Sequence, residues 1–518
     1  MKSFTRVATC GLALLQALVT GTPLPHYFEH VPFTRRDLPV VQIQKELGHQ
    51  ISKGSLIFGP EHRRYASATE RWSTFAVPKI QVVVQPAKES DVSKIVKYCN
   101  RNSIEFYVVN RGHSITSGSA DFNGMQIDMA SLTGITINRH KKSGWFQGGV
   151  YGDIVINYLW NHGYVTTTGS CTCVGLLGPG LGGGHGRFEG RYGMVSDNLL
   201  QLNVVLANGS AITVNETSYP DLLWAMRGAG HNFGIVTSFE APIHPRGAPL
   251  WHYHNYFWTQ DKLETVFEEL NKFHNNGSTP VEMALNFGIF RFDTTISETE
   301  AIIWWTFAYQ GSEEEAEKLL EPFNKIGAVR EDSGDVPYPE IPDIQGTGIG
   351  GWLCPGNRTH ITSTAGLQVY NVTAERQIYD RIGHWVTKHP EFTTVSVVHE
   401  GYSTEGVTNK NPADSAYPFR DDHHLMFFDV MVERFPHLKD EARAWATETM
   451  DLWNSGQPQR LPNAYVNYAN GLEPVEWQYG HEPWRLERLR KLKAKYDPQN
   501  HFRYYNPIIR NDNTTRTY

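Results

Sequence analysis

Two short glycine-containing segments constrain this chain more than any other feature of its sequence. The first, Asn110-Arg111-Gly112-His113-Ser114, follows an apolar run, and the second begins at Gly169 and carries Cys171 and Cys173 ahead of three consecutive glycines at 182–184. Because glycine lacks a Cβ, several backbone N–H groups of such a run can converge on one anionic group. A loop histidine and two thiols beside a glycine run therefore predict a ligand site.

Both segments resemble those of the FAD-linked oxidases that share the vanillyl-alcohol-oxidase-type, or PCMH-type, flavin domain, and within them the berberine-bridge-enzyme-like oxidases. In that subfamily the histidine of a Gly-His-Ser sequence bonds the 8α carbon of the flavin, and a cysteine eleven residues before a Gly-Gly-Gly run bonds carbon 6. The resemblance implies FAD bound covalently through His113 and also through Cys171, which lies eleven residues before Gly182. It covers roughly residues 70 to 245 and about 460 to 508.

Further contacts to FAD follow from the same resemblance. Arg111 is placed to neutralise the pyrophosphate or, alternatively, is only solvated. Val174 matches a small residue at the family's oxygen-access position, which favours an oxidase that uses O2. The segment Gly228 to Thr237 resembles the glycine-rich stretch that follows the flavin site. The remaining residues expected at the cofactor are Gly112, Ser114, Gly175, Gly182, Gly183, Gly184, Gly234 and Val236.

The thiols leave alternatives open. Many relatives carry only the histidyl bond, in which case neither thiol reaches the flavin. Spacing favours Cys171 over Cys173, which occupies a position where relatives often carry threonine, and the two are too close for an unstrained bridge to each other. Cys99 is expected to be a buried thiol on a helix. Cys354 has no assignment.

The C-terminal segment resembles the closing part of the same family. Tyr465-Val466-Asn467-Tyr468 lies on an expected strand that returns to the flavin, ahead of a basic helix. By resemblance Tyr468 is the candidate catalytic base, and Asn467 positions the substrate or the flavin. A free phenol has a pKa near ~10, so a base role requires a neighbour that lowers it. The alternative is a tyrosine that only packs. Some relatives place a glutamate on the substrate face, and its counterpart is not identified from the sequence.

The pattern of apolar residues predicts an α+β fold. We expect a signal peptide at 1–21, a lead-in segment at 22–70, and a two-part FAD-binding domain at 71–245 and 456–510. A substrate domain of sheet and helices, dense in aromatic residues, is inserted at 246–455.

Several elements have clear boundaries in the sequence. Asn208-Gly209 lies between apolar runs and predicts a hairpin with a type I′ turn. The expected strands include 81–85, 104–109, 125–129, 145–150 and 301–309. The expected helices include 89–102, 151–162, 219–227, 261–274, 313–323 and 486–495.

Charge and motif content argue against several function classes. The formal net charge is -7 and no Lys/Arg tract is present, so we expect no nucleic-acid partner. Asp421-Asp422-His423-His424 and His399-Glu400 contain metal-ligand residue types without metal-motif spacing, so they are expected to be solvated or structural and no metal site is predicted. Gly178 to Gly183 satisfies G-x-G-x-x-G but lacks the strand and acidic residue of a Rossmann site.

The N-terminus predicts export. Basic residues precede an apolar stretch from Val7 to Val19, which is too short to span a bilayer, and small residues follow it. The alternative is a disordered cytosolic leader. We expect a secreted protein without a membrane partner, and the oligomeric state is not defined by the sequence. Six Asn-x-Ser/Thr sequons support secretion: Asn208, Asn215, Asn276, Asn357, Asn371 and Asn513.

Taken with these motifs, the resemblance implies an FAD-dependent oxidase of a small-molecule substrate. A hydride would pass to the flavin, a tyrosine-type base would take a proton, and O2 would accept the electrons to form H2O2. The aromatic-rich middle, which shows no carbohydrate motif, favours oxidative tailoring of a secondary metabolite. The alternatives are a carbohydrate oxidase and a flavin-binding homologue without turnover.

Overall fold

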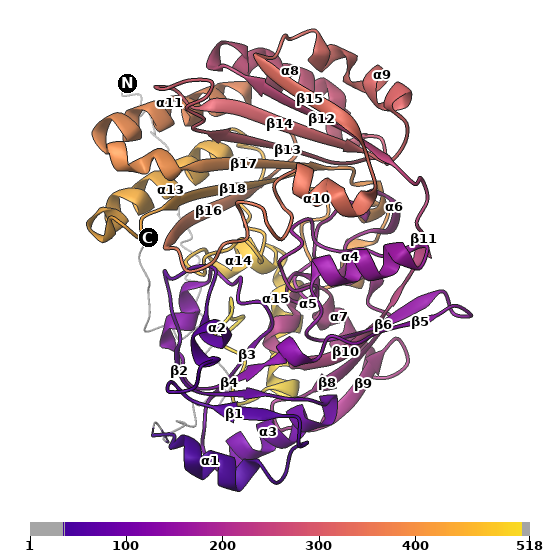
Figure 1. The fold of residues 1–518 in the computed structure, drawn as a ribbon, viewed down its shortest axis with the longest axis vertical. Coiled ribbons are helices and arrows are strands. Elements are labelled where there is room, and N and C mark those ends of the chain that lie inside the picture. The colour runs from indigo at the N-terminus through magenta and orange to yellow at the C-terminus, as the bar shows by residue number, and fades with distance from the viewer. Residues whose placement is uncertain (1–34, 36, 510–518) are drawn as a thin grey trace, which may run out of the picture.

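The computed structural model describes residue 35 and residues 37–509, which form three main β-sheets with helices packed around them (Figure 1). The predicted signal peptide and the sequon at Asn513 lie outside the described residues. Mixed sheets and helices confirm the predicted α+β class.

The first sheet has four strands in the order β1-β2-β4-β3, and β1 is its antiparallel edge. Helix α3 begins with Glu89 and Asp91, whose charges suit the positive end of the helix dipole, and it buries its apolar side, including Cys99, as predicted. The elements are α1 (Val40–Leu47), β1 (Leu56–Phe58), α2 (Tyr65–Thr69), β2 (Lys79–Gln85), α3 (Glu89–Arg101), β3 (Phe106–Val109) and β4 (Asn123–Asp128).

The second sheet is antiparallel, in the order β5-β6-β10-β8-β9. Its strands are β5 (Ile135–Asn138), β6 (Ser143–Gln147), β8 (Gln201–Val205), β9 (Ala211–Asn215) and β10 (Ile235–Pro242). Helices pack on it and between the sheets: α4 (Gly152–Asn161), α5 (Leu177–Gly180), α6 (Glu189–Tyr192), α7 (Pro220–Ala229), α14 (Val475–Tyr479) and α15 (Pro483–Tyr496). A small pair joins β7 (Tyr164–Val165) to β11 (His244–Pro245).

The hairpin of β8 and β9 forms as predicted, but its turn type differs. A type I′ turn needs two residues at positive φ, and here only Gly209 lies there, at +82°. Asn208 instead accepts a hydrogen bond from the Ser210 N–H through its side chain at 2.9 Å. The prediction was wrong because an Asn can also bond its own loop in this way.

The third sheet has seven antiparallel strands in the order β15-β12-β14-β13-β17-β18-β16. The strands are β12 (Trp251–Trp258), β13 (Met283–Arg291), β14 (Ile302–Tyr309), β15 (Arg330–Val336), β16 (His360–Leu367), β17 (Ser396–Tyr402) and β18 (His424–Met431). The helices are α8 (Leu263–His274), α9 (Glu313–Asn324), α10 (Ile341–Ile344), α11 (Val372–Lys388), α12 (Glu405–Thr408) and α13 (Lys439–Ser455).

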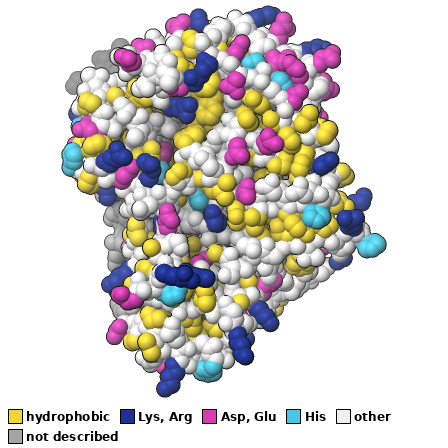
Figure 2. All heavy atoms as spheres, in the orientation of Figure 1, with side chains coloured by type: hydrophobic (Ala, Val, Ile, Leu, Met, Phe, Trp, Pro, Cys, Tyr) yellow, Lys and Arg dark blue, Asp and Glu magenta, His cyan; other side chains and the backbone are white. Residues whose placement is uncertain are grey.

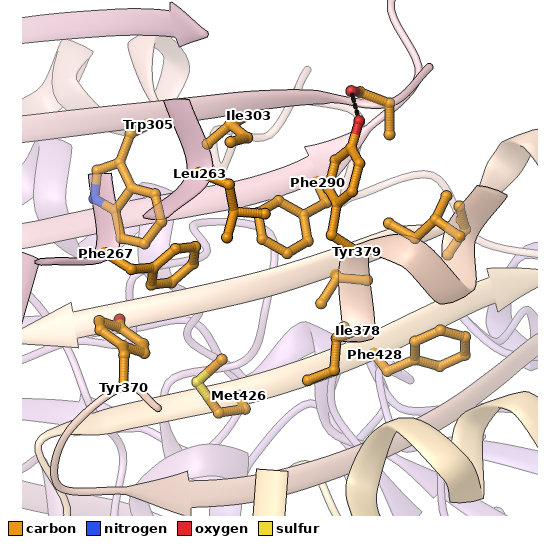
Figure 3. Close-up of a cluster of buried hydrophobic side chains, with 14 of the residues drawn as sticks. Leu263, Phe267, Phe290, Ile303, Trp305, Tyr370, Ile378, Tyr379, Met426 and Phe428 are labelled. Atoms are coloured by element: carbon orange, nitrogen blue, oxygen red, sulfur yellow. Dashed lines mark hydrogen bonds between the residues drawn. The ribbon is translucent and has the colours of Figure 1, made fainter. Parts of the chain in front are cut away.

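The two faces of this sheet have different partners. Helices α8, α9, α11 and α13 cover the outer face, where Figure 3 shows Phe267, Trp305 and Met426 within one buried cluster. The inner face carries a second aromatic cluster that also includes Ile115 of the N-terminal half and Tyr465 of the C-terminal segment. The inner face is therefore in contact with the loops that the sequence assigns to FAD.

The C-terminal segment returns to the first half of the chain, and Figure 1 shows it running among the N-terminal elements. Lys493 is fully buried and donates to the Asn232 carbonyl and to Asp497, each at 2.7 Å. A buried ammonium requires such partners. The strand expected at Tyr465 to Tyr468 is absent, because these residues form irregular chain and a turn in which Tyr468 N–H bonds the Tyr465 carbonyl.

Surface charge and helix hydropathy are relevant to nucleic-acid and membrane partners. On the face in view, Figure 2 shows Lys and Arg scattered among Asp and Glu. Within residues 35 and 37–509, no helix is both long and apolar enough to cross a membrane.

Candidate active site

His113 lies in the loop that follows β3. One ring nitrogen, Nδ1, is 3.1 Å from the Arg111 carbonyl, and the other, Nε2, is 3.5 Å from Cys173 Sγ. Burial lowers the pKa of His113 to about 4. The imidazole is therefore neutral near neutral pH, the form that has a nucleophilic nitrogen.

The thiols divide into a disulfide and a free cysteine. Cys173 and Cys354 are bonded, which links the loop of the first half to the segment after α10. Cys171 is free, and its Sγ lies 3.5 Å from that of Cys173 and 3.9 Å from that of Cys354. Burial raises the pKa of Cys171 to about 12. The disulfide thus gives Cys354 a partner and leaves Cys171 as the thiol available beside His113.

The loop around His113 has the donors that an FAD pyrophosphate needs. Among the described residues, no hydrogen bond uses the backbone N–H groups of Gly112, His113 or Ser114, and Gly112 has a φ of +70°. Successive N–H groups of this kind form a concave anion site. Arg111 adds a cation beside it: the guanidinium lies 4.4 Å from the centre of the Tyr151 ring, and Nε donates to the Cys173 carbonyl. These residues fit the cofactor.

The glycine run at 182–184 packs closely against the C-terminal segment. The N–H of Gly182 donates to the Pro179 carbonyl and that of Gly184 to the Tyr465 hydroxyl, so these two donors already have partners. A Cβ on Gly182 would lie 2.5 Å from Asn467 Oδ1, and one on Gly183 would lie 2.9 Å from the Tyr417 ring. In this structure the run permits close packing of the C-terminal segment.

Asn467 is held against that run. Its Nδ2 donates to the Pro179 carbonyl at 3.0 Å and to the Tyr465 hydroxyl at 2.6 Å. The structure therefore brings Asn467 to the glycine segment, although the two are far apart in the sequence.

The other expected cofactor residues lie in two places. Gly175 packs on Asn110, where a Cβ would be 2.6 Å from Asn110 Nδ2, so it belongs to the His113 region. Gly234 packs on Val204, and Val236 is buried in β10. Among the described residues, no hydrogen bond joins Gly234 or Val236 to His113 or Cys171.

Tyr468 is bound to a glutamate that sequence reasoning missed. Its hydroxyl donates to Glu400 Oε1 at 2.7 Å, and the Tyr402 hydroxyl donates to Glu400 Oε2 at 2.8 Å. Tyr402 also lies 2.9 Å from Ser170 Oγ, next to Cys171. Two tyrosines and one carboxylate thus connect the C-terminal segment, strand β17 and the thiol loop.

Burial raises the pKa values of both Tyr468 and Glu400. The pKa of Tyr468 is raised well above its ordinary value by burial and by the Glu400 charge, so a lowered phenol pKa, the expected condition for a base, is not met. Burial also raises the pKa of Glu400, against the hydrogen bonds from Tyr468 and Tyr402 that lower it. A carboxylate with raised proton affinity is a better acceptor near neutral pH.

Of the metal-type residues in the sequence, Glu400, which was expected to be solvated or structural, is buried beside Tyr468. His399 faces the opposite side and pairs with the buried Glu375 at 2.9 Å. Asp422 accepts from Arg460, and burial raises its pKa to about 6. A charged residue within the apolar strand β17 was the signal that could have identified Glu400.

Family profiles match both ends of the chain. The profile described as "FAD binding domain" matches residues 80–215, and "Berberine and berberine like" matches residues 464–509. FAD-linked oxidoreductase anuG of Penicillium roqueforti is 52% identical over 509 residues, covering 98% of this chain and 100% of that protein. FAD-linked oxidoreductase iacH of Pestalotiopsis fici is also 52% identical over 509 residues, covering 97% and 98%.

Solved structures share the fold at low identity. BBE-like 1 of Physcomitrella patens has a TM-score of 0.76 at 20% identity and covers 92% of this chain and 100% of its own. Glucooligosaccharide oxidase from Acremonium strictum, described with a 6-S-cysteinyl, 8α-N1-histidyl FAD, has a TM-score of 0.74 at 18% identity, covering 90% of this chain and 98% of its own. With two profiles and relatives of half identical sequence over the full length, the chain belongs to the berberine-bridge-enzyme-like FAD-linked oxidoreductases and is an enzyme of that family.

Proposed function

We propose that this enzyme oxidises a small organic substrate, with Tyr468 and Glu400 removing the proton and O2 as the final electron acceptor. FAD, when bound, would supply the hydride acceptor, and its reoxidation would reduce O2 with two electrons and two protons to H2O2. The observation that carries the proposal is the Tyr468–Glu400 contact at 2.7 Å beside the loop of Cys171.

The two residues act as a relay. A phenol with a raised pKa keeps its own proton at neutral pH and cannot accept a second one unaided. As the substrate O–H or N–H proton moves to Tyr468 Oη, the phenol proton moves to Glu400 Oε1, so the charge ends as a neutral carboxyl. Tyr402, donating to the other carboxylate oxygen, holds Glu400 in place.

The substrate class is inferred from the inner face of the seven-stranded sheet. Its side chains near the relay are aromatic, including Phe427, whose ring centre lies 5.0 Å from that of Tyr468. Such a face favours a planar apolar metabolite, and we propose oxidative tailoring of a secondary metabolite. A carbohydrate oxidase is the second candidate, because solved neighbours of the same fold include chitooligosaccharide oxidase, at a TM-score of 0.75.

A substrate panel separates these candidates. The purified enzyme is mixed without oxygen with phenolic, polyketide-like and alkaloid-like compounds and with oligosaccharides, and flavin bleaching is followed. We expect bleaching by an aromatic compound and H2O2 release when air is admitted. Bleaching by oligosaccharides alone would assign the second candidate, and a flavin that no compound reduces would support a binding protein without turnover.

We also propose that FAD is attached to His113 and Cys171. The neutral His113 ring and the free Cys171 thiol support this assignment, while Cys173 is occupied by its disulfide. Intact mass after acid denaturation should show flavin on the chain. His113→Ala and Cys171→Ala should each retain it through the other bond, and the double variant should release it. Release of all flavin by the unaltered protein would contradict the attachment.

Export remains part of the proposal. Residues 1–21 would act as a signal peptide, and of the five sequons in the described part of the chain, four have exposed asparagines, at Asn208, Asn276, Asn357 and Asn371. The N-terminal sequence and glycan content of protein recovered from culture medium test this.

A further inference from the structure

A cluster of two histidines and a glutamate lies on the outer face of the seven-stranded sheet, under helix α9. His252 and His254 are two residues apart on β12, so both side chains point to the same face, which also carries Tyr256 and Trp258 of the helix-covered core. Glu317 comes from α9. The inner face, which carries Glu400, is on the other side of the sheet, so this cluster is separate from the proposed catalytic relay.

Both histidines contact the same carboxylate oxygen of Glu317. Glu317 Oε1 lies 2.9 Å from His252 Nε2 and 2.7 Å from His254 Nδ1, and these three ligand atoms fall within 4.8 Å of one another. Both histidines are buried, and Glu317 is one-quarter exposed, which leaves a route from solvent. Two imidazole nitrogens and a carboxylate oxygen are a common ligand set for Zn²⁺.

Neighbouring polar side chains surround these three residues and orient them. His252 Nδ1 lies 2.8 Å from Asp335 Oδ1, so its other nitrogen faces a carboxylate, as ligating histidines commonly do. His254 Nε2 has no hydrogen-bond partner, and its nearest carboxylate is Glu331, 3.7 Å away. Asn324 Nδ2 donates to Glu317 Oε2 at 2.8 Å, which directs Oε1 toward the histidines.

A neutral His252 cannot donate a hydrogen bond to both of the carboxylates that it faces. A neutral imidazole donates through one nitrogen only, yet both nitrogens of His252 face carboxylate oxygens, those of Asp335 and Glu317. Either a positive imidazolium or a bound cation between His252 Nε2, His254 Nδ1 and Glu317 Oε1 removes the repulsion of facing lone pairs. A cation does this for both histidines at once.

We propose that His252, His254 and Glu317 bind a divalent transition-metal ion of the Zn²⁺ class, with water completing the coordination. The site joins β12 to α9 and has a structural role. No single motif marks it in the sequence, because the H-x-H pair and the glutamate are separated by more than sixty residues.

Zn²⁺ and Co²⁺ titrations of the chelator-treated, flavin-loaded full chain test the proposal. We expect one Zn²⁺ per chain by calorimetry, visible Co²⁺ bands typical of tetrahedral coordination, and a rise in unfolding temperature with Zn²⁺. Glu317→Gln, which keeps side-chain size and the contact to Asn324, and His254→Ala should lose all three signals. Asp335→Asn should bind about 10- to 100-fold more weakly.

Two controls separate this site from adventitious binding. His437→Ala and His140→Ala each remove an exposed histidine, and both variants should bind Zn²⁺ as the unaltered protein does. Unfolding without metal shows that each variant is folded. Equal Zn²⁺ binding by the unaltered protein and His254→Ala, or no binding by either, would overturn the proposal and leave a proton-linked network.

Discussion

Glu400 accepts hydrogen bonds from the Tyr468 and Tyr402 hydroxyls and is the final proton acceptor of the proposed relay. His113 and Cys171 were identified by local spacing, whereas Glu400 depends on a contact with Tyr468, 68 residues away. Nothing near Glu400 in the sequence marks it except a charge within an apolar strand. The role of Tyr468 could be suggested by resemblance, but its raised pKa could not, because burial is a property of the folded chain.

Replacing Glu400 by Gln should slow anaerobic flavin reduction by about 10²- to 10⁴-fold, the usual effect of removing a general base. Tyr468→Phe should have a similar effect, and the double variant little more, because the two act in series. In the unaltered enzyme the rate should rise with pH through the raised Glu400 pKa, since only the carboxylate accepts a proton. Glu400→Gln should lack this rise.

Stopped-flow measurement of reduction separately from reoxidation provides the readout. Glu298→Gln, an exposed position in the same part of the chain, is the matched control and should leave the rate unchanged. A Glu400→Gln enzyme that reduces its flavin within a few-fold of the unaltered one across pH would assign Glu400 a packing role.

At the scale of elements, periodicity predicted most strands and helices to within a few residues, including α3, α4, α8 and β14. The three helices have one buried side, so their apolar spacing is set by local geometry, whereas β14 is buried at every position and is a continuous apolar run. The segment Tyr465 to Tyr468 is apolar for a different reason. It packs against the glycine run, where Gly183 also lies beside Tyr417, without pairing to a strand, and that placement depends on residues far along the chain.

The glycine run offers a test of this packing. Gly182→Ala places a Cβ 2.5 Å from Asn467 Oδ1 and 2.6 Å from Val466, so it should lower the unfolding free energy by about 1–3 kcal/mol and displace the C-terminal segment. Gly178→Ala is the control, because its Cβ meets nothing within 4 Å. Chemical denaturation compares the two. An equal effect of both changes would argue against the close contact.

For the whole molecule, buried histidines link stability to pH. Burial lowers the pKa of His274 to about 3 and that of His501 to about 4. In the unfolded chain each histidine has the ordinary pKa of about 6.5, so at pH values between the folded and unfolded pKa the unfolded chain binds more protons. The contribution of the neutral, buried histidines to stability is therefore lost as the pH falls below about 6.5. Asp422, with a pKa raised to about 6, acts in the opposite direction.

His274→Gln should isolate one proton of this linkage. Relative to the unaltered protein, its unfolding free energy should fall less steeply between pH 6.5 and about 4, by at most ~1.4 kcal/mol per pH unit. Urea unfolding at several pH values measures the slope, and His437→Gln, at an exposed position, should keep the original slope. Parallel curves for all three proteins would show that His274 titrates alike in both states.

The buried Lys493 has a consequence for how the protein is made. Its ammonium is held by the Asn232 carbonyl, so the turn that leads into β10 acquires this partner only when α15 has been synthesised. Since the ribosome delivers the chain from its N-terminus, residues 251–455 must emerge before the first half can close. The seven-stranded sheet can assemble earlier, and the nucleotide-binding half is completed last, although its motifs come first in the sequence.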